Sequence, residues 1–173
     1  ETLDTLALDK DQMVRWYYAR QKFLHDYQEY VSTSDFTVLD EDKVKYYQDR
    51  ILSDTEATSP INRQMRIFRM LNERDYEKAY EENRYFIGSL DPEKHGYAVQ
   101  TYWQGVICDN LGLDEETMKW WAESAISDVK GAVKDNASLC SVAIKLVDSE
   151  DAERAFKYIR ISLDDAVYYN AKL

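Results

Sequence analysis

Apolar residues recur along the chain at three- and four-residue spacings, the pattern of amphipathic helices. In the first segment, for example, Met13 is followed by Trp16 and Tyr17 on the same predicted helix face. Turn and capping residues separate these segments, and no segment shows the alternation of a convincing strand. We therefore predict an all-α fold whose short connections pack successive helices antiparallel. The predicted helices span about 9–31, 40–51, 61–71, 76–90, 95–112, 114–131, 137–147 and 151–163.

The composition supports helices and restricts the classes of partner. Five glycines and two prolines in 173 residues are too few for a turn-rich all-β fold. A net charge of −11 argues against direct contact with nucleic acid, which needs a basic face, and against an anionic membrane surface. No stretch approaches the roughly 18 apolar residues of a membrane span, and none resembles a signal peptide. Cys108 and Cys140 fall inside predicted helices, so we expect free thiols, which leave the redox compartment open.

One helical segment returns later in the chain. The segment "RDYEKAYEENRYFI" (74–87) aligns with "EDAERAFKYIRISL" (150–163), an offset of 76 residues that matches Asp75 with Asp151 and Ala79 with Ala155. A third helix of the same kind, "LDEETMKWWAESAI" (113–126), lies between them. The underlying period is therefore about 38 residues, within the range of helical-hairpin repeats. An irregular helical bundle is the alternative interpretation.

These residues resemble tetratricopeptide repeats, in which helix A packs against helix B. Gly105 stands at the small position of helix A, Gly112 follows at the turn seven residues later, and Ala79 and Ala155 stand at the alanine of helix B. A small residue is needed there because two helices approach closely only where no bulky side chain intervenes. Three positions depart from the pattern: Arg74 and Glu150 replace the turn glycine, and Thr117 or Met118 replaces the middle alanine.

The resemblance implies a right-handed superhelix of about four antiparallel helical hairpins. We expect residues 1–173 to form a single helical-repeat domain. Its expected parts are a divergent N-terminal hairpin (1–55), three hairpins (59–92, 96–131 and 136–165) and the start of a further element (166–173).

The last third resembles an uncharacterised Bacteroidetes family of membrane-anchored regulators. The similar residues are Lys134–Leu139, Ala155, Tyr158–Ser162, Asp164–Ala166 and Tyr169–Leu173, whereas the glycine that the family has near Ser149 is absent. The resemblance implies a sensor part on the periplasmic or extracytoplasmic side, cut before a membrane helix, a coiled coil and a cytoplasmic end. The residues themselves leave the cytoplasm open as a location.

Residue patterns that carry chemistry point to no enzyme. His25 and His95 have no ligand partners at metal-binding spacing, and no phosphate loop, dinucleotide fingerprint or nucleophile elbow occurs. The carboxylate clusters at 40–42 and 114–116 lie at predicted helix starts, where capping explains them. We therefore expect no cofactor, no metal and no catalytic residue.

We expect a non-catalytic module that binds a protein or a peptide, or another copy of itself, on the face lined by its A helices. A glycan-binding protein of the starch-uptake type is the alternative, and it would need exposed aromatic platforms and long loops. The predicted partner-binding residues share one repeat register: Gln64, Phe68, Tyr102, Val106, Asp109, Cys140 and Ile144, with Val147 completing the last helix.

Overall fold

The computed structural model describes residues 41–130 and 137–169, and within these ranges every regular element is an α-helix. The predicted all-α fold class is thereby confirmed. The predicted helix at 9–31 lies outside the described residues. The helices are α3 (Glu41–Asp54), α4 (Pro60–Asn72), α5 (Tyr76–Ile87), α6 (His95–Asn110), α7 (Asp114–Lys130), α8 (Ala137–Asp148) and α9 (Ala152–Tyr169).

Most helix boundaries follow the predicted ones to within a few residues, and two of the differences have a clear physical reason. Helix α5 ends at Ile87 rather than near Leu90, because the backbone N–H groups of Ser89 and Leu90 bond to carbonyls of the last turn and tighten it. Helix α9 continues to Tyr169, beyond the expected end at Leu163. The residues after Leu163 include neither glycine nor proline, so nothing in the sequence stops the helix there.

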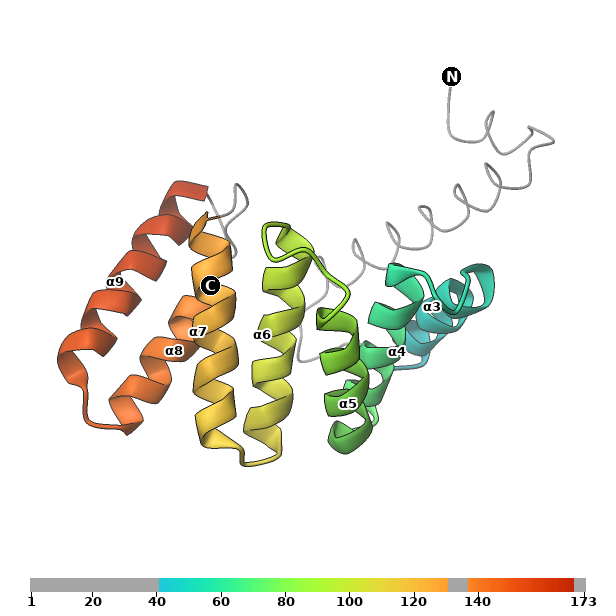
Figure 1. The fold of residues 1–173 in the computed structure, drawn as a ribbon, viewed down its shortest axis with the longest axis horizontal. Helices are drawn as coiled ribbons and strands as arrows, with labels where there is room; N and C mark the ends of the chain where they lie inside the picture. The colour runs from blue at the N-terminus through green and yellow to red at the C-terminus, as the bar shows by residue number, and fades with distance from the viewer. Residues whose placement is uncertain (1–40, 131–136, 170–173) are drawn as a thin grey trace, which may run out of the picture. The chain divides into compact units, whose positions relative to one another are not determined.

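The chain divides into two compact units between Glu73 and Arg74. The described part of the first unit contains α3 and α4, which pack together. In the second unit each helix packs against the next one in sequence, α5 on α6, α6 on α7, α7 on α8 and α8 on α9 (Figure 1). Pairing in sequence order is the arrangement that an array of hairpins requires. The single domain expected over residues 1–173 stays a prediction.

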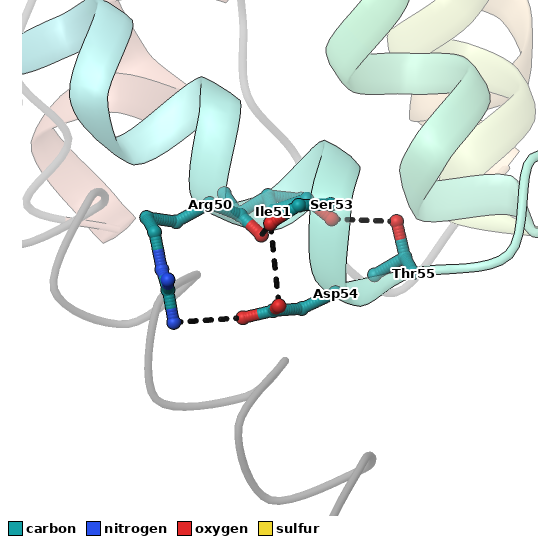
Figure 2. A network of polar contacts seen from close by, with 5 residues as sticks. All are labelled: Arg50, Ile51, Ser53, Asp54 and Thr55. Atoms are coloured by element: carbon teal, nitrogen blue, oxygen red, sulfur yellow. Dashed lines mark hydrogen bonds and ion pairs between the residues drawn. The ribbon is translucent and has the colours of Figure 1, made fainter.

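The first unit is held together by an apolar cluster and a capped helix end. Ile51 from α3 is fully buried against Ile61 and Met65 from α4. The end of α3 is closed by polar contacts (Figure 2): the Thr55 hydroxyl donates to the Ile51 carbonyl at 2.7 Å, and the Ser53 hydroxyl donates to the Arg50 carbonyl at 3.0 Å. These hydroxyls add hydrogen bonds to the carbonyls of the last turns of α3.

Asn62 ties the start of α4 to the end of α3. Its amide nitrogen donates to the Leu52 and Thr55 carbonyls, both at 3.2 Å, and to the Thr55 hydroxyl at 3.0 Å. The Asn62 backbone N–H in turn donates to the N-cap Ser59 hydroxyl at 3.3 Å, with Pro60 at the first helical position. A buried amide with several partners fixes the angle between two helices more tightly than apolar contact alone.

The backbone conformation of the connections repeats with a strict 38-residue period. Arg74, Gly112 and Glu150 have φ angles of 58°, 72° and 63°, and they are the positive-φ residues of the described chain. Each lies two residues before the first residue of a helix: Arg74 before α5, Gly112 before α7 and Glu150 before α9. The two residues that replace the turn glycine therefore adopt the same left-handed conformation as Gly112, at some cost in strain for a side chain with a Cβ atom.

The same period identifies the small position of the B helices. Ala79, Thr117 and Ala155 lie 38 residues apart and are 0%, 0% and 2% exposed. Thr117 rather than Met118 therefore occupies the alanine position of the middle repeat. Its hydroxyl donates to the Leu113 carbonyl at 3.0 Å, so the polar atom is satisfied within the helix.

Gly105 leaves room for the Trp121 indole of α7 against α6. A Cβ atom at this position would lie 2.8 Å from Cγ of Trp121 and closer still to neighbouring indole atoms. The Trp121 indole N–H donates to the Tyr102 carbonyl at 3.2 Å, one turn before the glycine. The indole thus occupies the space that a side chain at position 105 would fill, which explains why glycine is needed here.

Candidate partner-binding face

The predicted binding residues of the second unit lie on two A helices. We call them the A-helix face: Tyr102, Val106 and Asp109 on α6, with Cys140, Ile144 and Val147 on α8. Each α8 residue lies 38 positions after its α6 counterpart, so the repeat register places them at equivalent points of their helices.

The α6 part of this face is partly built into the core. Tyr102 and Val106 are half-buried and pack against a cluster of Trp121, Val142, Leu146 and Ala155. They therefore join α6 to the later helices while keeping part of their surface accessible. Replacing Tyr102 would change stability as well as any binding.

The α8 part of the face is open to solvent. Ile144 and Val147 are 53% and 59% exposed, although they lie on a helix whose opposite side buries Val142, Ala143 and Leu146. Cys140, one turn before Ile144, is half-buried. Exposed aliphatic side chains next to half-buried ones form a continuous apolar edge along α8.

An ion-pair network joins the two parts of the face. The Lys145 ammonium on α8 contacts Asp109 of α6 at 2.6 Å and Asp114 of α7 at 3.2 Å. The hydrogen bonds that Lys145 donates to Asp109 and then to Asp114 raise the pKa of Lys145 above its usual value. Two carboxylates share one ammonium, so this edge of the face keeps a net negative charge. Lys145 was not predicted from the sequence, since nothing in its spacing distinguishes it from a solvated lysine.

The predicted binding residues of the first unit, Gln64 and Phe68, do not belong to the A-helix face as defined above. Phe68 packs beside the cluster of Ile51, Ile61 and Met65, and Gln64 is half-buried on α4. Both contribute to the first unit, and their role in binding stays a prediction.

Comparison with known proteins identifies the family. The family model described as "SusR N-terminal TPR domain" matches residues 1–173. The chain belongs to this family. It is therefore a TPR-like domain of a Bacteroidetes SusR-type regulator, and both resemblances seen in the sequence are confirmed. Among curated proteins and among solved structures, none matches the chain.

The cysteines of this SusR-type TPR domain are free thiols. Burial raises the pKa of the Cys108 thiol to about 11, and the nearby Glu116 carboxylate acts in the same direction. Cys108 accepts a weak contact from the Gln104 amide at 3.9 Å and serves as a packing residue. Cys140 lies on the A-helix face and is the more accessible of the two.

Within the described ranges, the SusR-type TPR domain contains no cluster of three side chains suited to holding a metal ion. No helix in the described part of the chain is both long and apolar enough to cross a bilayer. The polar contacts between helices are structural: Tyr80 donates to Glu116 at 2.8 Å and Tyr97 donates to Glu123. Burial and then the Glu123 contact raise the pKa of Tyr97 to about 12, so this hydroxyl stays protonated at physiological pH.

Proposed function

We propose that this domain is a non-catalytic module that binds an extended peptide or protein segment along the A-helix face, as the sensor part of a membrane-anchored regulator. The exposure of Ile144 and Val147 on an A helix carries the proposal. TPR-like arrays present their A helices to partners, so exposed apolar residues at these positions lie where a partner would bind.

The chemistry of the face indicates which segments it would bind. Apolar ligand side chains would cover Ile144 and Val147, burying surface at roughly 25 cal/mol per Å². A basic ligand residue would lie near Asp109 and Asp114, where one lysine is shared by two carboxylates. The proposed ligand is therefore a segment with two apolar anchors and a basic residue nearby.

A peptide library displayed on phage, selected on the whole chain, provides the probe. Selected peptides are then titrated by fluorescence anisotropy against the chain and against the double variant Ile144→Ser/Val147→Ser. Loss of two anchors should weaken binding by at least about tenfold. Enrichment of apolar residues flanked by lysine or arginine is also expected among the selected sequences.

The chain offers a matched control on another helix. Ile126 and Val129 on α7 are 56% and 55% exposed and have the same three-residue spacing. The variant Ile126→Ser/Val129→Ser removes the same amount and kind of surface outside the face, so its affinity should equal that of the unchanged chain. Equal losses in both double variants, or no loss in either, would contradict the A-helix face as the binding site.

The sensor role is supported by membership of the SusR-type family. We propose that the domain lies on the extracytoplasmic side of the membrane in the full-length protein. Labelling of a cysteine introduced at the exposed Glu153 by a membrane-impermeant maleimide in intact cells tests the location. Labelling only after the cytoplasmic membrane is opened would place the domain in the cytoplasm instead.

Binding of glycans would need aromatic platforms at the same place. The exposed residues of the A-helix face are aliphatic or charged, whereas the exposed aromatics Tyr46, Tyr85 and Phe156 lie on α3, α5 and α9. Calorimetry with a panel of oligosaccharides should therefore show no heat of binding. A saturable signal that Ile144→Ser/Val147→Ser leaves intact would favour the glycan-binding alternative.

A further inference from the structure

The outer side of α9 carries a second apolar surface, separate from the A-helix face. Phe156, Leu163 and Val167 are 69%, 46% and 82% exposed. Their spacings of seven and four residues correspond to about two turns and one turn of helix, so the three side chains lie in one stripe. We call this the α9 stripe.

The repeat register shows what happens to the same positions earlier in the chain. Leu163 corresponds to Ala125 on α7 and Ile87 on α5, which are only 7% and 6% exposed. Phe156 corresponds to Met118, which packs against the Trp121 cluster. The Leu163 position, which is covered in the two preceding B helices, is therefore open on α9, and the Phe156 position is more exposed than the half-buried Met118. The α9 stripe has the composition of an internal helix contact.

The charges beside the stripe select an occupant. In the N-terminal half of α9, exposed Arg154, Lys157 and Arg160 outnumber exposed Glu153, so this half is net positive. Exposed Asp164 lies in the C-terminal half. A second α9 running antiparallel would bring each basic half against an acidic half, and its dipole would also be opposed. A parallel copy would instead place like charges side by side.

We propose that the α9 stripe is a self-association surface, on which two copies of the chain pair through antiparallel α9 helices about a two-fold axis. With the axis between Arg160 and Leu163, Phe156 of one copy lies opposite Val167 of the second copy. In the same register Arg160 lies opposite Leu163 of the second copy, the residue directly before Asp164. Such an isologous contact closes on itself and forms a dimer without further growth.

The contact is small, which sets the expected affinity. One helix stripe buries less than the roughly 800 Å² per partner of a standard stable interface. The isolated chain should therefore dimerise weakly, with a dissociation constant of roughly micromolar or above. Sedimentation velocity over a range of concentrations should show a reversible monomer–dimer equilibrium.

Cysteine cross-linking tests the geometry as well as the existence of the dimer. In a Cys140→Ser background, Leu163→Cys places two thiols about 5 Å apart along the helix axes of an antiparallel pair, and Phe156→Cys places them about 16 Å apart. A short bismaleimide should link Leu163→Cys chains and leave Phe156→Cys chains unlinked. Mixing Phe156→Cys with Val167→Cys chains should restore linking between unlike copies.

Two substitutions provide a matched pair for the affinity. Phe156→Ser should weaken dimerisation at least about tenfold, as expected for an aromatic anchor. Tyr85→Ser on α5 changes an aromatic residue of the same 69% exposure and should leave dimerisation unchanged. Far-UV circular dichroism of each variant checks that the helices are intact.

Four results would overturn the proposal. The first is a folded chain that stays monomeric up to millimolar concentration, which would assign the stripe to a different chain. The second is equal linking of Leu163→Cys and Phe156→Cys, which would indicate a parallel pair. The third is a dimer that Phe156→Ser leaves intact. Loss of dimerisation in Ile144→Ser/Val147→Ser would instead show that the A-helix face is the contact, which separates this proposal from peptide binding.

Discussion

Asn83 on α5 and Trp121 on α7 occupy the same position of successive repeats, 38 residues apart, and each packs where its helix meets its neighbours. Asn83 is fully buried and Trp121 is 7% exposed. One position thus accepts an amide in the first junction and an indole in the next. The residues that face Asn83 are amides, whereas those that face Trp121 are mainly apolar.

The α5–α6 junction is built from amides. The Asn83 amide nitrogen donates to the Gln100 carbonyl at 3.0 Å and to the Gln104 side-chain oxygen at 2.9 Å. Among the described residues, the side-chain oxygens of Asn83 and Gln100 are buried without a hydrogen-bond partner. A buried polar junction that is only partly satisfied specifies an orientation but contributes little net stability.

The α7–α8 junction is mainly apolar. Trp121 packs in the cluster with Val142 and Leu146, which stand 38 residues after Gln104 and Cys108. The Ser124 and Ser138 hydroxyls contact each other across this junction at 2.6 Å, and Lys145 contacts Asp114 at its edge. The comparison teaches that the repeat fixes where helices meet and leaves the polarity of each junction free. Stability should therefore concentrate in the later junction.

The largest expected effect comes from removing the indole. Trp121→Ala should lower the free energy of unfolding by about 3–5 kcal/mol, because it deletes the centre of the cluster and leaves a cavity. Urea denaturation followed by circular dichroism at 222 nm measures this. The neighbouring half-buried Trp120 is the control, and Trp120→Ala should cost clearly less. Equal losses at both positions would remove the distinction between the two faces of α7.

The next effect tests the contact between Gly105 and Trp121. Gly105→Ala in the unchanged chain should lower the free energy of unfolding by about 1–3 kcal/mol, because its Cβ would overlap the indole. In the Trp121→Ala background the overlap is gone, and alanine's higher helix propensity should raise stability by up to about 1 kcal/mol. The effect of Gly105→Ala on the free energy of unfolding is thus expected to change sign between the two backgrounds, which denaturation curves in both backgrounds measure. A loss of similar size in both backgrounds would mean that the glycine serves another purpose.

Substitutions in the α5–α6 junction should change the free energy of unfolding less. Asn83→Ala leaves the Gln104 side-chain oxygen without its donor and should lower the free energy of unfolding by about 1–2 kcal/mol. The variant Asn83→Leu/Gln104→Leu removes both polar groups and should recover part of that loss, as an apolar replacement does when both partners go. If the double variant is less stable than Asn83→Ala, the amide pair contributes more than its burial suggests.

Much of this architecture could be predicted from the sequence because the period is local. Helix positions follow from apolar spacing, and Ala79 and Ala155 reveal the register by identity. The sequence does not decide whether Thr117 or Met118 occupies the alanine position of the middle repeat, since neither is an alanine. The structure resolves it through burial, which sequence spacing alone does not report.

The binding face and the junction chemistry were less accessible. The register places Val106 and Ile144 at equivalent points, yet Val106 is half-buried and Ile144 is 53% exposed. Exposure depends on which helix follows, and that is a property of packing. The contact from Lys145 to Asp109 joins residues 36 apart on different helices, and no local pattern encodes such a pairing.

The smallest effect tests the period on which the comparison of junctions depends. Arg74 and Glu150 adopt the left-handed conformation of Gly112. Glycine takes this conformation without the Cβ penalty, so Arg74→Gly and Glu150→Gly should each raise the free energy of unfolding by up to about 1 kcal/mol, whereas Gly112→Ala should lower it by about as much. Thermal denaturation should show shifts of a few degrees in opposite directions. Glu153→Gly, three residues after Glu150 and inside the first turn of α9, is the matched control and should lower stability by up to about 1 kcal/mol. A loss of stability in Glu150→Gly equal to that in Glu153→Gly would mean that the left-handed conformation of Glu150 carries no strain. The three connections would then share a backbone conformation without sharing a need for glycine.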